Sequence, residues 1–268
     1  KPTTKGATGY DLTRLLIGSE GTLAIVTEAT LKLTPLAGAT RTLAATFVDV
    51  ACATAAVTRI MAQPVIPCAL EFMDGEALRL ARNHAGDAIP QAGAILIIEV
   101  DGEAETLDSS SQAIRKAASV DGMLDIRIAA DGAEANRLWQ ARKALSPALR
   151  TIAPNKINED VVVPVSRVPE LIARLQVISK KHDIPIVTFG HAGNGNIHVN
   201  LLYDAQDPQQ AENAKPCLSR VFDLVLALGG TLSGEHGIGR EKRDYINRAI
   251  DPVTLDLMRR IKSQFDPK

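Results

Sequence analysis

The chain has 268 residues, of which 46% are hydrophobic, and this is enough apolar material for one large core or two modest ones. Thirty basic residues against 31 acidic ones give a formal net charge of −1, which excludes the strongly basic surface typical of a nucleic-acid-binding protein. The longest apolar runs are far shorter than the roughly 20 residues that a helix needs to cross a bilayer.

The first 35 residues contain Thr-Gly and Gly-Thr turns around β-branched residues, and they predict a loop with two short strands at 22–27 and 31–35. Pro35 and Gly38 then interrupt the pattern, so we expect a domain boundary there, dividing the chain into residues 1–37 and 38–268. Beyond it, strands and helices alternate. The expected strands are 41–50, 69–73, 94–100, 124–129, 161–163, 185–190 and 197–203. The expected helices are 51–63, 76–83, 104–119, 133–150, 168–182 with Ser166 as N-cap, 207–228 and 252–264.

This alternation, with short connections, favours an α+β domain with a largely antiparallel sheet and helices packed on one face. A doubly wound nucleotide-binding fold is disfavoured, because the glycine fingerprint of its first strand-helix turn is missing. Cys52, Cys68 and Cys217 are odd in number and far apart, a pattern that favours reduced, buried thiols in a cytoplasmic protein. The sequence starts without Met and ends abruptly, and we interpret it as a fragment.

Two glycine-rich loops carry most of the chemistry-bearing residues. In the segment 189–200, glycines allow a tight turn with His191 and His198 at its two shoulders, so two imidazoles can converge on one metal ion. In the segment 229–240, Glu235 and His236 stand between glycines. Glu235 would complete a catalytic set of three ligands, and the imidazole of His236 could accept a substrate proton. The alternative for His191 and His198 is that they only form hydrogen bonds within a loop. The alternative for the segment 229–240 is a helix C-cap followed by an exposed turn.

A third candidate lies in the long helix expected at 133–150. Arg142 offers a planar fork for a substrate carboxylate, and Ser146 lies one turn later on the same face. The alternative is that Arg142 is an ordinary solvent-exposed arginine on a helix.

These segments resemble the FAD-linked oxidases of the vanillyl-alcohol oxidase superfamily, in the branch of D-lactate, glycolate and D-2-hydroxyglutarate dehydrogenases. The resemblance covers essentially the whole chain. Residues 8–27 resemble the last part of the family's FAD-binding domain, and the rest resembles its substrate, or cap, domain, although 193–196 read Gly-Asn-Gly-Asn where Gly-Asp-Gly-Asn is usual.

The resemblance implies a role for each matching residue. It makes His191, His198 and Glu235 ligands of a divalent metal, zinc or similar, and His236 the catalytic base. It assigns substrate binding to Arg142 and Asn200, with Lys156 as the candidate for a further carboxylate-binding lysine, and FAD contacts to Gly18, Ser19, Glu20, Gly21 and Ile25. Ser146 is added to the substrate-binding residues because it shares the helix face of Arg142.

The implied reaction is the oxidation of a D-2-hydroxy acid, such as D-lactate or glycolate, to the 2-oxo acid, with hydride transfer to FAD. Because most of the FAD-binding domain would precede residue 1, the isolated chain is expected to be inactive. The expected partners are that missing domain, an unassigned electron acceptor and a second copy in a homodimer, in the cytoplasm or at the membrane periphery. The alternatives are a metal-dependent hydrolase and a non-catalytic metal-binding assembly domain.

Overall fold

The computed structural model describes residues 6, 8–85 and 90–267. The chain divides into two compact units, which are described separately. Unit 1 comprises residues 1–34 and 235–268, and unit 2 comprises residues 35–234. The second division, between Gly234 and Glu235, has no counterpart among the expected boundaries. No helix within the described ranges is long and apolar enough to cross a membrane.

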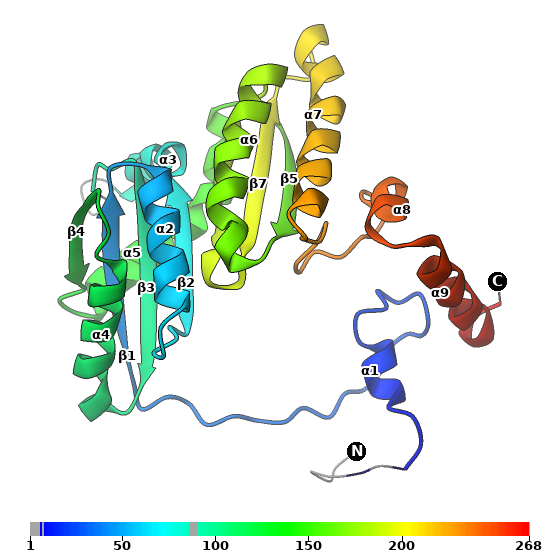
Figure 1. The fold of residues 1–268 in the computed structure, drawn as a ribbon, viewed down its shortest axis with the longest axis horizontal. Coiled ribbons are helices and arrows are strands. Elements are labelled where there is room, and N and C mark those ends of the chain that lie inside the picture. Colours follow the sequence, from blue (N-terminus) through cyan, green and yellow to red (C-terminus); the bar gives the residue numbers. More distant parts are fainter. Residues whose placement is uncertain (1–5, 7, 86–89, 268) are drawn as a thin grey trace. The chain divides into compact units, whose positions relative to one another are not determined.

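Unit 2 is built on a seven-stranded sheet in which every strand pairing is antiparallel (Figure 1). The strand order is β4-β1-β3-β2-β6-β7-β5. The strands are β1 (Ala39–Phe47), β2 (Ala69–Asp74), β3 (Ala94–Gly102), β4 (Met123–Ile128), β5 (Asn155–Val162), β6 (Ile186–His191) and β7 (Asn196–Tyr203). The predicted α+β class with a largely antiparallel sheet is therefore confirmed.

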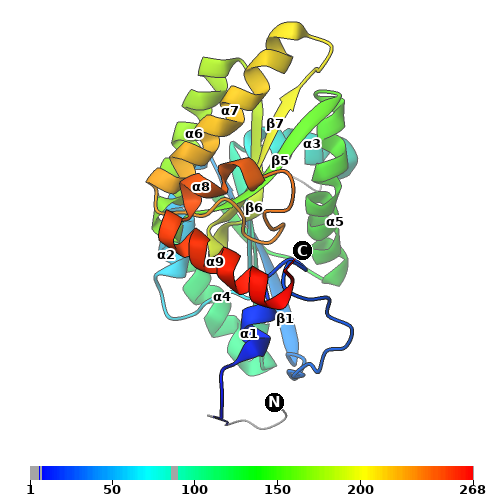
Figure 2. The same cartoon turned by 90° about the vertical axis from the view of Figure 1, so that its right-hand side faces the viewer.

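Helices cover both faces of this sheet, although one face was expected. They are α2 (Val50–Met61), α3 (Gly75–Ala85), α4 (Ala104–Ala118), α5 (Gly132–Ala148), α6 (Val168–His182) and α7 (Pro208–Ala227), with short 3-10 helices η2 (Leu149–Thr151), η3 (Val165–Arg167) and η4 (Ala192–Asn194). Figure 2 shows α6 and α7 on one side of the strands and α3 and α5 on the other. The reason is that β3 buries every residue of Ala94–Ile98, so both of its faces need an apolar cover.

The face covered by α3 and α5 contains one apolar cluster. It joins Met73, Val187 and Phe189 of the sheet to Leu138 and Leu145 of α5. This cluster holds α5, which carries Arg142, over β2 and β6, and β6 carries His191.

Acidic residues begin most of the helices. Asp49, Asp131 and Asp207 each accept a hydrogen bond from a backbone N–H in the first turn of α2, α5 and α7. The expected cap of α6 is wrong, because Ser166 lies inside η3 and Arg167 occupies the cap position without a side-chain bond.

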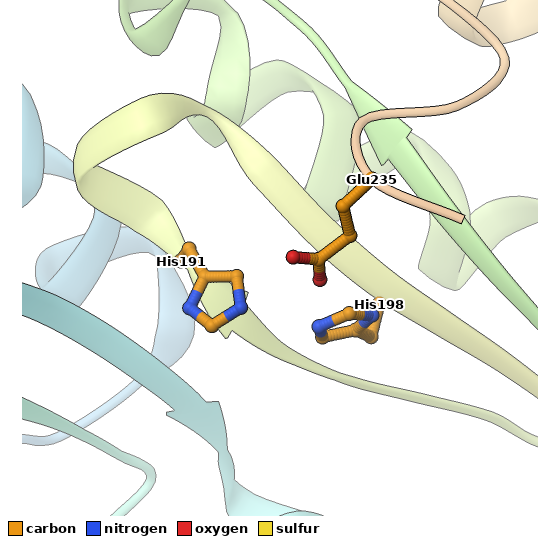
Figure 3. Close-up of side chains that lie close together, drawn as sticks. All are labelled: His191, His198 and Glu235. Atoms are coloured by element: carbon orange, nitrogen blue, oxygen red, sulfur yellow. The ribbon is translucent and has the colours of Figure 1, made fainter. Parts of the chain in front are cut away.

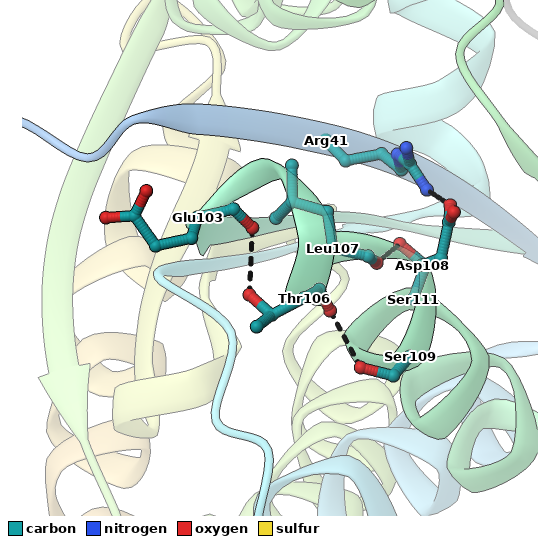
Figure 4. A network of polar contacts seen from close by, with 7 residues as sticks. All are labelled: Arg41, Glu103, Thr106, Leu107, Asp108, Ser109 and Ser111. Carbon is teal, nitrogen blue, oxygen red and sulfur yellow. Dashed lines mark hydrogen bonds and ion pairs between the residues drawn. The ribbon is translucent and has the colours of Figure 1, made fainter.

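Helix α4 also begins without a side-chain cap. Hydroxyl groups instead bond to carbonyls within its first turns, as Thr106 does to Glu103 and Ser109 to Thr106 (Figure 4). Asp108 of the same helix pairs with Arg41 of β1, which ties α4 to the sheet at the surface.

Unit 1 contains α1 (Leu12–Leu16), η5 (Arg243–Tyr245), α8 (Ile246–Ala249) and α9 (Pro252–Phe265). The two strands expected at 22–27 and 31–35 are wrong: the described residues there form no strand, and Ile25 is 86% exposed. A strand needs a partner strand to satisfy its backbone. The β-branched residues alone do not supply one.

The cysteines are all free, as expected, but their burial differs. Cys217 is buried, Cys52 is intermediate and Cys68 is exposed, so the expectation of three buried thiols is confirmed only for Cys217. Burial raises the pKa of the Cys217 thiol to about 11, which keeps it protonated at neutral pH.

Candidate functional site

The hairpin formed by β6 and β7 places both histidines of the first motif. His191 ends β6, and His198 lies near the start of β7. The connecting turn η4 closes with a 3.1 Å hydrogen bond from the N–H of Gly195 to the carbonyl of Ala192. Gly195 has a φ of 71°, and a Cβ atom there would lie 2.0 Å from the carbonyl oxygen of Val163. The turn therefore requires glycine at this position.

The strand register turns both imidazoles to one face of the sheet. His191 is paired with Asn196, and Phe189 is paired with His198. Paired residues of antiparallel strands share a face, as do residues two apart along one strand. The two imidazole rings accordingly lie 5.3 Å apart between centroids, edge to face, with an interplanar angle of 77°.

The segment that leads to Glu235 is fixed to β5, the edge strand beside β7. Thr231 and Val162 exchange two backbone hydrogen bonds of 2.9 and 3.1 Å. The N–H of Gly234 then reaches the fully buried Asp160, at 2.8 Å from its carbonyl and 2.9 Å from its carboxylate. Glu235 is one peptide bond beyond this anchored residue.

The three expected metal ligands form one group. The ligand atoms of His191, His198 and Glu235 all lie within 4.8 Å of one another. Figure 3 shows the carboxylate of Glu235 directed toward the space beside the two rings. His198 is buried, and Glu235 is exposed. The donor set of two imidazole nitrogens and one carboxylate oxygen suits zinc and related divalent ions.

A buried carboxylate, Glu71 of β2, lies directly behind His191. The two residues are paired across β2 and β6, and Oε1 of Glu71 is hydrogen-bonded to Nδ1 of His191. Its Oε2 accepts a 2.7 Å bond from Nε of Arg142 on α5. Burial favours a higher pKa for Glu71, but the hydrogen bond from His191 and the charge of Arg142 outweigh burial, and the pKa is lowered.

The expected substrate residues lie in two places on the face covered by α5. Arg142 lies over the ring of Phe189, with 4.6 Å between its Cζ atom and the ring centroid. One turn further along α5, Ser146 accepts a 2.8 Å hydrogen bond from Nζ of Lys156 on β5. Burial and the nearby charge of Arg150 lower the pKa of Lys156.

Asn200 is fully buried in β7, on the same face as His198. Its amide group donates to the carbonyls of Val187 and His198, at 3.2 and 3.3 Å. Its Oδ1 atom is buried and has no hydrogen-bond partner among the residues that the structure describes. Such a buried acceptor is unusual, and it suits a position beside a bound polar molecule.

The expected FAD-contacting residues lie in unit 1, after α1. Gly18 and Gly21 both have positive φ, and Gly18 and Ser19 line a pocket together with Met258 of α9. The side chain of Glu20 has a further role within the same unit. Its two carboxylate oxygens accept 2.8 Å bonds from the N–H groups of Ile238 and Gly239, in the loop that carries His236.

Glu71 and Asp160 are the site-building residues that sequence reasoning missed. Each is a buried carboxylate in a strand, and each contacts a residue at least 70 positions away in the chain. The available signal was an acidic residue inside an apolar strand, which is costly to bury unless it is paired. An acidic residue in an apolar strand therefore indicates that a buried partner exists, but it does not identify that partner.

The chain is similar to a known protein family and to several named proteins. The family model described as "FAD linked oxidases, C-terminal domain" matches residues 36–268. Glycolate oxidase subunit GlcD of Bacillus subtilis (strain 168) is 37% identical over 265 residues, covering 98% of this chain and 56% of that protein. D-lactate dehydrogenase of Archaeoglobus fulgidus is 34% identical, covering 99% of this chain and 58% of that protein. The chain thus spans just over half the length of these relatives.

Two solved structures share the fold. p-Cresol methylhydroxylase with substrate bound matches with a TM-score of 0.66 and 15% identity, over 87% of this chain and 52% of that one. Alkyldihydroxyacetonephosphate synthase matches with a TM-score of 0.63 and 20% identity, over 98% and 50%. At these identities the likeness concerns the fold alone.

Proposed function

The chain belongs to the family of FAD-linked oxidases, as their C-terminal domain, and from this premise we propose that it is the substrate-binding part of a flavin-dependent D-2-hydroxy acid dehydrogenase. The observation that carries the proposal is the grouping of His191, His198 and Glu235 within 4.8 Å, beside the partly buried Arg142. The relatives named glycolate oxidase and D-lactate dehydrogenase support a small 2-hydroxy acid as substrate.

A divalent metal, zinc or similar, fits the three residues. In a tetrahedral zinc site with bonds of about 2.1 Å, ligand atoms lie roughly 3.4 Å apart. A separation of at most 4.8 Å requires only small side-chain rotations to reach that spacing. A bound ion would act as a Lewis acid and a template for the substrate.

The substrate carboxylate is assigned to Arg142, with Ser146, Lys156 and Asn200 as further polar contacts. The guanidinium group has a rigid planar fork that matches a carboxylate. Its Nη1 and Nη2 atoms have no hydrogen-bond partner within the described part of the chain, and its side chain is 13% exposed. While Nε pairs with Glu71, these two terminal nitrogens can donate hydrogen bonds to a substrate carboxylate.

His236 is assigned as the base that accepts the proton of the substrate hydroxyl. It follows Glu235 directly in the chain, so a proton acceptor adjoins a metal ligand. When FAD is bound, it supplies the redox chemistry by accepting the hydride from C2 of the substrate. We assign the FAD contacts of this chain to the backbone around Gly18, Ser19, Glu20, Gly21 and Ile25, and the remaining contacts to the part of the protein that this chain does not span.

The test is flavin reduction by the full-length protein with a panel of D- and L-2-hydroxy acids. The D-acids should reduce the flavin. His236→Ala should lower the rate at least 100-fold, which is the low end of the contribution of a general base, while metal content by elemental analysis stays unchanged. His182→Gln, at the end of α6, is the matched control and should reduce flavin as the parent protein does. Unchanged reduction in His236→Ala would reject the assigned base, and no reduction by any 2-hydroxy acid would reject the function.

A further inference from the structure

Glu71 holds two functional side chains with one carboxylate. It lies in β2 and is 5% exposed. One carboxylate oxygen bonds the ring of His191, and the other accepts from Arg142. These partners come from β6 and α5, 120 and 71 residues further along the chain. Glu71 therefore connects the proposed metal ligand to the proposed carboxylate-binding residue.

The contact with His191 fixes which ring nitrogen carries the proton. An ionised carboxylate only accepts hydrogen bonds, so Nδ1 of His191 must donate. In a neutral imidazole the lone pair then lies on Nε2. Figure 3 shows one ring nitrogen of His191 turned toward Glu235 and His198. Glu71 thus prepares the imidazole in the tautomer that a metal ion needs.

The contact with Arg142 fixes the orientation of the guanidinium group. The bond uses Nε, on the side of the group, and the Cζ atom lies 4.6 Å above the ring of Phe189. A planar group held at one edge and on one face cannot rotate freely. Its two terminal nitrogens therefore point in a fixed direction.

We infer that Glu71 is a positioning residue that sets the metal-binding tautomer of His191 and the orientation of Arg142 together. This inference rests on the proposed function. A purely structural role, as the ion-pair partner of the partly buried Arg142, predicts a different outcome: removing the charge would lower stability without changing metal affinity.

Glu71→Gln separates the two roles in the full-length protein. Glutamine has one acceptor oxygen where glutamate has two. The cationic guanidinium is the stronger donor, so the oxygen should stay with Arg142 and the amide group should face Nδ1 of His191. The proton of the ring then moves to the metal-facing nitrogen. We expect the affinity for Zn²⁺, measured by chelator competition on the metal-free protein, to fall about 10- to 100-fold.

Glu99→Gln is the matched control. Glu99 lies on the adjacent strand β3, and it also contacts α5, through a 3.1 Å bond from Nε1 of Trp139. The control removes the same charge and disturbs the same helix, but the Glu99 carboxylate accepts hydrogen bonds from the side chains of Thr42 and Trp139, so the Zn²⁺ affinity of Glu99→Gln should match that of the parent.

Unchanged Zn²⁺ affinity in Glu71→Gln overturns the inference, whether or not the melting temperature falls. If Glu71→Gln does not fold, Glu71→Asp replaces it, because it keeps the charge but retracts the carboxylate by about 1.5 Å from His191. Its Zn²⁺ affinity should also fall, and an unchanged value overturns the inference. A parent protein whose Zn²⁺ uptake is insensitive to His198→Ala would instead refute the proposed metal site itself, and the role of Glu71 with it.

Discussion

Replacing Gly195 by alanine should damage the hairpin that carries His191 and His198 far more than its backbone angle alone implies. Gly195 has φ 71°, and Gly229 has φ 74°, so an alanine at either position pays the same left-handed strain of about 1–2 kcal/mol. The two positions differ in the room that is available for a Cβ atom. Nothing lies within 4 Å of a Cβ atom at Gly229, whereas at Gly195 the carbonyl oxygen of Val163 would be 2.0 Å away.

The difference between the two variants gives the cost of the clash. An ordinary contact between carbon and a carbonyl oxygen is about 3.3 Å, so Val163, the residue after β5, and the turn must separate by more than about 1 Å. Overpacking of this kind costs typically 1–3 kcal/mol. We therefore expect Gly195→Ala to lose about 2–5 kcal/mol of unfolding free energy and Gly229→Ala about 1–2 kcal/mol.

The assay is denaturant unfolding of the full-length protein and of both variants, followed by Zn²⁺ titration of the folded proteins. Zn²⁺ binding should weaken in Gly195→Ala only, because only that substitution displaces the turn between the two histidines. Equal losses of stability in the two variants would show that the contact with Val163 does not hold the turn, and the reasoning would be refuted.

Two further predictions concern other parts of the structure. Glu20→Ala should speed amide hydrogen exchange at Ile238 and Gly239 by about tenfold, since the loss of each hydrogen bond to a charged group costs about 1.5 kcal/mol. Glu28 is exposed, and Glu28→Ala is the control. Unchanged exchange in Glu20→Ala would contradict the role of Glu20. The pKa of Lys156 in the folded protein is below its ordinary value of 10.5, so between those two pH values the unfolded chain binds more protons than the folded one. The parent protein should therefore gain stability relative to Lys156→Met as the pH rises through that window, which thermal melts can measure. A stability difference that stays constant with pH, or that changes in the opposite direction, would contradict it.

The elements with an apolar pattern could be predicted from the sequence, and those with a polar pattern could not. Helix α6 begins and ends where it was expected, at Val168 and His182. Strand β5 was expected only over Val161–Val163, but it begins at Asn155. Its first half contains Lys156, Asn158 and Asp160, whose strand structure depends on pairing with β7 rather than on their own preferences.

The residues of the candidate site could also be predicted only in part. His191, His198 and Glu235 could be proposed from two glycine-rich loops, because such loops bring side chains close to a ligand. Glu71 and Asp160 could not be proposed as their supports. Their partners are set by the strand order β2-β6-β7-β5, which no local pattern in the sequence reveals.

The register of β6 and β7 limits which length changes the hairpin can tolerate during evolution. Side chains alternate between the faces of a strand, so one residue inserted between Asn196 and His198 would turn that imidazole toward α6 and α7. The same insertion inside η4 would lengthen only the turn. Homologous chains should therefore vary in length within η4 before they vary within either strand, and a pair of compensating changes in β7 would be needed to keep both rings on the same side.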